Sequence, residues 1–227
     1  MSLIMGKLPP MGSNLNPIKY FIIFVLCLSN AHASFFLLPQ LGLSPAGETE
    51  MKTYDATDSW THNARYYESA ELELIAGVHF WNVFLGPLVS WGPAWQEASR
   101  NSDNQLAKAN RYRNTFYVFR YGGSLTFSPP SFPIYLGITY SISRAQVHYA
   151  QPKFQNPFHQ DDVLNGTGMG IVLGYLFPSK SLFSIEIRST EYSRLKSQGI
   201  TTELPSGSIT SNFSTTEVLL QTSFLIE

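Results

Sequence analysis

The sequence predicts an all-β chain that closes into an antiparallel transmembrane barrel of eight strands, with short turns at one end and long loops at the other. Three observations carry this prediction: an export-type leader, segments in which apolar and polar residues alternate, and connections that alternate between long and short. Aromatic residues make up 14% of the 227 residues and hydrophobic residues 44%, yet the mean hydropathy is only -0.05. Diluted hydropathy of this kind is typical of alternating strands and not of membrane helices.

The N-terminal segment 1–33 is predicted to be a signal peptide that is cleaved after Ala33. Lys19 precedes an apolar run over 20–28, and small residues then lead to the cleavage site. The apolar run is too short to span a bilayer as a helix. The single cysteine lies in this leader, so we expect no disulfide in the mature chain. We therefore predict two segments, the leader and a barrel domain over 34–227.

The clearest alternation lies in the segment from Gly168 to Tyr192, where two arms flank a tight polar turn. One face of the first arm carries Met169, Ile171 and Leu173, and the other face is mostly glycine. This hairpin alone fits both a soluble sandwich and a membrane barrel, and the rest of the chain decides. Alternation recurs in further predicted strands over 34–44, 66–80, 83–96, 113–127, 134–143 and 213–226.

Two prolines interrupt the pattern in one predicted strand. Pro87 and Pro93 lie within the strand predicted over 83–96. Because proline has no backbone N–H to donate to a neighbouring strand, we expect a bulge or an irregular edge there.

The predicted connections alternate in length around the chain. Long polar loops are expected over 45–63, 97–110, 150–165 and 196–211, and short turns at 81–82, 128–133 and 178–181. This alternation is typical of barrels whose short turns lie in the periplasm and whose long loops lie outside the cell. Unpaired strand edges are costly in lipid, so we expect the sheet to close. Eight strands enclose a lumen that side chains fill.

This strand rhythm, together with the leader, resembles the small eight-stranded outer-membrane barrels of the OmpA and opacity-protein type. The resemblance covers most of the mature chain and rests on no residue motif. It implies location in the bacterial outer membrane after export, insertion by the barrel-assembly machinery and contact with outer-membrane lipid. Such barrels often end on an aromatic residue, whereas here Phe224 is followed by three further residues.

Five charged residues fall on the predicted inward face and form a candidate site: Glu71, Glu73, Arg120, Glu186 and Arg188. Charges in so narrow an interior are tolerable only when they are paired. We therefore predict that the two arginines bridge the glutamates and plug the barrel.

A second candidate site lies where strands meet the long loops. Arg113, Arg144 and Arg194 are predicted at this outer rim. Because the planar guanidinium donates two parallel hydrogen bonds to phosphate, we predict that these arginines contact lipopolysaccharide phosphates. A solvated loop charge remains the alternative for each of them.

The function expected from these features is a structural or surface-interaction barrel, with the long loops available to an extracellular ligand. The alternatives are a narrow pore or small-ligand carrier, and a lipid-modifying enzyme. Glu191, Tyr192 and Ser193 lie near the outer rim, but a lipid A deacylase would want a histidine in place of Glu191. We therefore expect no enzyme, no catalytic residue, no metal and no cofactor. The net charge of -1 gives no support for nucleic acid as a partner.

Overall fold

A computed structural model describes residues 34–54, 59–102, 111–129, 132–153, 156–207 and 209–226. The leader lies outside these residues, so the signal peptide and its cleavage site stay predictions. The chain from Ser34 to Glu227 forms one compact unit. Within the described ranges, no helix has the length and apolar character that a membrane crossing requires.

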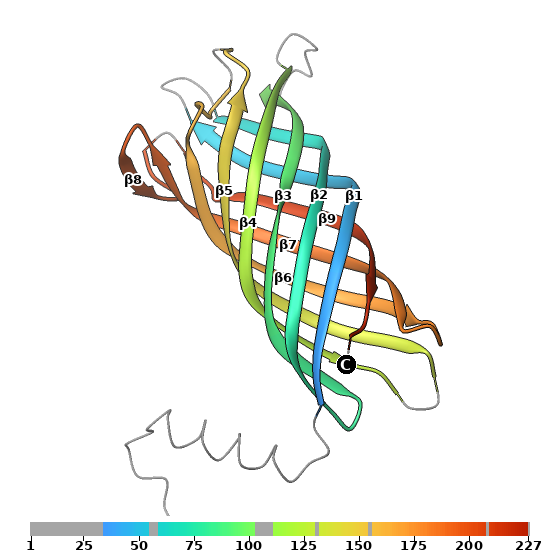
Figure 1. Cartoon of the computed structure of the whole chain (residues 1–227). Coiled ribbons are helices and arrows are strands. Elements are labelled where there is room, and N and C mark those ends of the chain that lie inside the picture. The colour runs from blue at the N-terminus through green and yellow to red at the C-terminus, as the bar shows by residue number, and fades with distance from the viewer. Residues whose placement is uncertain are drawn as a thin grey trace, which may run out of the picture. The chain divides into compact units, whose positions relative to one another are not determined.

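The strands of this unit are β1 (Ser34–Tyr54), β2 (Ser59–Phe80), β3 (Val83–Ser102), β4 (Arg111–Phe127), β5 (Ile134–Ala150), β6 (Val163–Leu176), β7 (Ser181–Ser197), β8 (Ile200–Glu203) and β9 (Phe213–Phe224). Successive strands pair antiparallel from β1 to β7, β7 pairs with β9, and β9 pairs with β1 (Figure 1). Eight strands therefore close into a ring, and β8 adds only to the end of β7. The predicted closed eight-stranded antiparallel barrel is confirmed.

Alternation of side chains along each strand separates an apolar exterior from a filled interior. On β4, Phe119 and Tyr121 point outward and are 41% and 48% exposed, whereas Val118 and Arg120 are buried inside. Outward apolar residues on this strand run from Tyr117 to Phe127, which corresponds to roughly 25 Å of height in a barrel with the usual tilt. An apolar belt of that height matches the thickness of an outer-membrane barrel's lipid-facing band.

Strands extend into the predicted long loops, and β8 lies within the one expected over 196–211. The loop expected over 45–63 contains the end of β1 and the start of β2, and β3 continues to Ser102 within the loop expected over 97–110. Backbone pairing continues here, for example between Glu50 and Asn63. Above the apolar belt both faces of a hairpin can be polar, so the pairing persists where the alternation of polarity ends.

Of the two alternatives expected at the prolines of β3, the structure has the irregular edge and not the bulge. The register between β3 and β4 is constant through both Pro87 and Pro93. The irregularity lies in the pairing with β2, which is interrupted beside each proline without a shift of register. The missing N–H groups therefore face β2. A true register shift in this strand pair lies elsewhere, between Ala64 and Tyr66.

Three layers of side chains fill the described lumen. An apolar cluster near the short turns contains Phe36, Leu38, Ile75, Phe84, Leu88, Tyr135, Val172 and Leu182. A larger cluster toward the long loops includes Tyr67, Phe116, Val118, Phe158, Leu164, Tyr192 and Phe213. On β2 and β7 the charged residues lie between the members of these two clusters. The charged layer is therefore sealed by apolar side chains on both sides.

Candidate functional site: an ion network across the lumen

Six charged side chains meet in the middle layer and form what we call the ion network: Glu71 and Glu73 on β2, Arg120 on β4, Glu186 and Arg188 on β7, and Glu217 on β9. All six are buried. The structure thus brings together all five charged residues that the sequence placed inside the barrel, and it adds Glu217.

Arg188 is the hub of the ion network. Its Nη1 atom lies 2.8 and 2.9 Å from the two carboxylate oxygens of Glu71, so one nitrogen contacts both oxygens. Its Nη2 atom lies 2.7 Å from Glu186 Oε2 and 3.2 Å from Glu73 Oε2, and its Nε donates to Glu186 Oε1 at 3.0 Å. One guanidinium therefore hydrogen-bonds three carboxylates, and Glu217 Oε1 lies 3.9 Å from its Nη1. Its N–H donors thus find acceptors within the buried site.

Arg120 connects this hub to the other side of the ring. Its Nη1 lies 2.5 Å from Glu71 Oε2, and its Nη2 lies 2.6 Å from Glu217 Oε1. Glu71 consequently contacts both arginines and also accepts a hydrogen bond from Ser90 at 3.4 Å. Charge-assisted bonds of this kind are stronger than neutral ones, and Glu71 accepts hydrogen bonds from both arginines.

Neutral side chains also donate hydrogen bonds to the carboxylates of Glu186 and Glu217. Thr139 Oγ1 donates to Glu186 Oε1 at 2.6 Å, and Gln221 Nε2 donates to Glu186 Oε2 at 3.1 Å. Ser69 Oγ donates to Glu217 Oε2 at 2.8 Å. A network that uses most of its donors and acceptors holds a single arrangement, because each alternative leaves a polar atom unpaired in a low-dielectric interior.

Gly170 makes room for this arrangement. A Cβ atom added at Gly170 would lie 2.0 Å from Glu186 Oε1 and 2.4 Å from Thr139 Oγ1. The glycine on β6 therefore lets the Glu186 carboxylate pass close to the barrel wall. This requirement explains why an apolar alternating strand carries a glycine opposite the charged layer.

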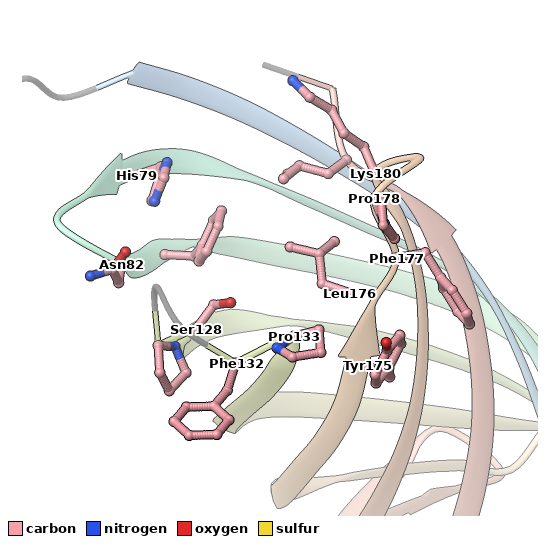
Figure 2. Close-up of a pocket in the computed structure, with 13 residues that line it drawn as sticks. His79, Asn82, Ser128, Phe132, Pro133, Tyr175, Leu176, Phe177, Pro178 and Lys180 are labelled. Carbon is pink, nitrogen blue, oxygen red and sulfur yellow. The ribbon is translucent and has the colours of Figure 1, made fainter.

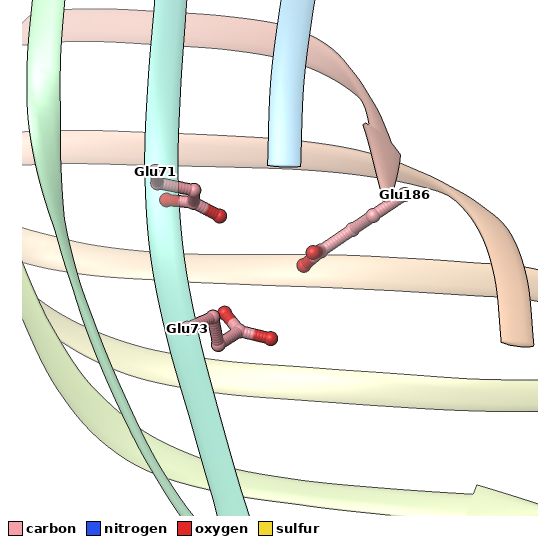
Figure 3. Close-up of side chains that lie close together, drawn as sticks. All are labelled: Glu71, Glu73 and Glu186. Atoms are coloured by element: carbon pink, nitrogen blue, oxygen red, sulfur yellow. The ribbon is translucent and has the colours of Figure 1, made fainter. Parts of the chain in front are cut away.

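The ion network holds more negative than positive charge. Four carboxylates face two guanidinium groups, which leaves two formal negative charges in excess. Ligand atoms of Glu71, Glu73 and Glu186 lie within 4.8 Å of one another, close enough to share a cation (Figure 3). Arg188 contacts all three carboxylates and so supplies the positive charge at this point.

Sequence reasoning missed Glu217, although the signal was present. The sequence reading assigned Val218 and Leu220 to the outer face of the last strand. The same alternation places Glu217, one residue earlier, on the inner face. In the structure Glu217 pairs in register with Arg188 on β7, so a strand alignment would also have found it.

At the short-turn end the lumen opens into a hollow of about 580 Å³ (Figure 2). His79, Asn82, Phe132 and Lys180 lie around it, and the His79 ring stacks on Phe84 at 4.1 Å between centroids. Phe84 belongs to the apolar cluster below the charged layer. The hollow therefore ends on packed side chains in the part of the lumen that the structure describes.

The three arginines predicted at one rim do not lie together. Arg144 on β5 and Arg194 on β7 both pair in register with Asn165 on β6, which places them roughly 10 Å apart in one row. Arg144 also pairs with Phe119, six residues from Arg113 along β4, so Arg113 lies roughly 20 Å further along that strand.

Two of these arginines, Arg113 and Arg194, each contact an acidic side chain. Arg113 contacts Glu97 Oε2 through Nε at 3.0 Å and through Nη2 at 2.9 Å. Arg194 Nε lies 3.3 Å from Glu203 Oε1 on β8. All three arginine side chains remain exposed to the exterior, so these ion pairs position the guanidinium groups without burying them.

The residues considered for an enzymatic site split between two faces. Tyr192 is buried inside the barrel, whereas Glu191 and Ser193 are exposed. The Glu191 carboxylate accepts a hydrogen bond from the Asn212 side chain. This segment thus has the ordinary alternation of a barrel strand.

No protein-family model and no curated protein matches the chain. Among solved structures, Neisserial surface protein A is 14% identical with a TM-score of 0.39, over 85% of this chain and 97% of that one. Outer membrane protein AlkL in lipid bilayers is 10% identical with a TM-score of 0.47, over 98% and 97%. Outer membrane protein OprG from Pseudomonas aeruginosa is 9% identical with a TM-score of 0.44, over 86% and 95%. At these identities the comparisons transfer no activity to this chain.

Proposed function

We propose that this protein is a bacterial outer-membrane β-barrel with a structural or surface-interaction role, exported by its leader and inserted by the barrel-assembly machinery. The observation that supports the location is the belt of outward apolar side chains on a closed ring of strands. A closed ring satisfies every strand's backbone in lipid, and an apolar exterior is stable only where lipid surrounds it.

The plugged lumen supports a role that does not depend on transport. The ion network crosses the interior, and an apolar cluster packs on each side of it. A solute would have to separate buried ion pairs and repack two apolar layers in order to pass. A narrow pore is the alternative function, and the conductance measurement described below would reveal it.

The long hairpins at the other end are the proposed interaction surface. β1 and β2 remain paired well above the apolar belt, as far as Tyr54 and Ser59. Rigid paired strands can present side chains to an extracellular ligand without the entropy cost of ordering a loop. Below them, Arg144 and Arg194 are proposed to contact lipopolysaccharide phosphates in the outer leaflet.

Two measurements on the full chain test this proposal. Membrane fractionation of expressing cells should place the mature protein in the outer membrane, with different gel migration before and after boiling. Planar-bilayer recordings of the purified protein should show no large, steady conductance. A soluble periplasmic protein would overturn the location, and a steady conductance would favour the pore.

A further inference from the structure

A slot on the outer face of β2 to β5 lies at the upper edge of the apolar belt. Glu68, Trp95, Thr115 and Tyr149 form one row across these four strands, since each pairs in register with the next. Together with Glu97 and Arg113 they line a hollow of about 510 Å³. We call this hollow the Trp95–Tyr149 slot.

A bulge in β5 builds one wall of the slot. The register between β4 and β5 shifts between Thr115 and Phe116, so that Thr115 pairs with Tyr149 and Phe116 pairs with Val147. Strict alternation from the buried Val147 would place Tyr149 inside the barrel. His148 is the extra residue, and both it and Tyr149 are exposed. The bulge therefore turns Tyr149 onto the outer face.

The width of the slot suits a single ring. Trp95 and Tyr149 stand on either side of β4, roughly 10 Å apart at the backbone, and the short Thr115 lies between them. The two aromatic side chains are 46% and 47% exposed. A saturated ring that contacts both aromatic faces needs about 7–8 Å between them.

Polar groups of both signs border the aromatic walls. The Arg113 side chain is 73% exposed, and Glu97 orients its guanidinium through two contacts to one carboxylate oxygen. Arg111 lies 3.5 Å from the other oxygen of Glu97, so two guanidinium groups share one carboxylate. The Glu68 carboxylate is exposed on the opposite strand. The slot thus offers N–H groups that can donate to a phosphate on one side of the two aromatic residues. On the other side it offers a carboxylate that can accept a hydrogen bond from a hydroxyl group.

We propose that the Trp95–Tyr149 slot binds a phosphorylated sugar unit of a membrane glycolipid. The aromatic walls contact the sugar ring, Arg113 binds the phosphate, and Glu68 accepts a hydrogen bond from a sugar hydroxyl. The slot lies where the apolar belt gives way to polar residues, which is the level of a glycolipid headgroup whose acyl chains lie along the belt. This inference rests on the proposed outer-membrane location, and it concerns a different surface from Arg144 and Arg194.

The test is native mass spectrometry of the full mature barrel in detergent with three probes: bisphosphorylated lipid A, phosphatidylglycerol and free glucosamine 1-phosphate. Thr115→Trp fills the slot, and Thr216→Trp is the matched control because Thr216 is an exposed, outward-facing residue of β9, outside the slot and away from the row of Arg144 and Arg194. We expect Thr115→Trp to bind lipid A at least about tenfold more weakly than wild type, and the control to remain within about twofold.

A second pair of variants covers the case in which Thr115→Trp fails to fold. Trp95→Leu keeps an apolar outward residue but removes the aromatic wall, and Trp91→Leu is its control because Trp91 stacks on Tyr117 outside the slot. Gel migration before and after boiling reports folding of each variant. The proposed outer-membrane location and the proposed slot are thereby tested separately. A slot variant that folds and still binds lipid A as wild type does would contradict the slot but not the location.

Three results would overturn the inference. Wild-type affinity for lipid A in both folded slot variants would show that the slot is not the site. An equal loss of phosphatidylglycerol binding would show that the sugar is not recognised. Free glucosamine 1-phosphate that binds as tightly as lipid A would show that the ligand is a soluble sugar phosphate and not a glycolipid.

Discussion

Arg120 and Glu217 touch across the full width of the barrel. They lie on β4 and β9, four strands apart in either direction around the ring, yet Arg120 Nη2 is 2.6 Å from Glu217 Oε1. Two side chains can bridge a closed sheet in this way only if its lumen is narrow, as it is with eight strands. The contact therefore shows that side chains from opposite walls of the barrel meet and fill the lumen at this level.

The two glutamates of β2 should respond differently to neutralisation. Glu71 contacts both arginines, whereas Glu73 contacts Arg188 alone, at 3.2 Å. We expect Glu71→Gln to lower the free energy of unfolding by roughly 3–5 kcal/mol, as when a buried pair is broken. Glu73→Gln should change it by about 1 kcal/mol or less, because it also removes one of the excess negative charges. Urea titration in detergent micelles measures both, and equal losses would contradict this ranking.

Gly170 should be intolerant of even one methyl group. Alanine there would place Cβ 2.0 Å from Glu186 Oε1 and so displace a carboxylate that Arg188 and Thr139 hold. We expect Gly170→Ala to destabilise the barrel by roughly 1–3 kcal/mol, the usual cost of overpacking. Gly123→Ala is the control, since its Cβ would meet one atom within 4 Å, Gly86 O at 3.8 Å. Thermal shifts of gel migration compare the two, and similar melting temperatures would contradict the steric argument.

The row that contains Arg144 and Arg194 should carry most of the stabilisation by lipopolysaccharide. Both flank Asn165 on adjacent strands, so two guanidinium groups can reach phosphates of one molecule. In Arg144→Gln/Arg194→Gln, we expect added lipopolysaccharide to raise the melting temperature by less than half as much as in wild type. Lys180→Gln, at the short-turn end, is the control. An undiminished rise in the double variant would exclude this row as the contact.

The last residues of the chain should contribute to the seam between β1 and the C-terminus. Leu37 and Ile226 exchange two backbone hydrogen bonds, of 2.8 and 2.9 Å. Ile226→Pro removes the donor to Leu37 O, so we expect a loss of about 1 kcal/mol in the free energy of unfolding. Ile226→Ala keeps that donor and serves as the control. Equal unfolding midpoints for the two variants would show that the bond does not stabilise the seam.

Within the apolar belt, sequence periodicity was sufficient for the number of strands in the ring and for the side of the wall that the alternating residues face. Glu71, Arg120 and Arg188 could be placed inside because side chains of a strand alternate strictly between two faces. Where polar residues occupy both faces, as over 45–63, periodicity carries no signal. The strands there are visible only through their backbone pairing.

The sequence by itself determined a closed, eight-stranded barrel with a charged interior, since these features depend on local pattern and on the cost of unpaired backbone in lipid. Only the tertiary structure decided which charges meet, because register between strands sets contacts such as Arg120 with Glu217. It also separated Arg113 from Arg144 and turned Tyr149 outward through a one-residue bulge. A shift of one residue reverses the face of a side chain, and no pattern within a single strand reveals it.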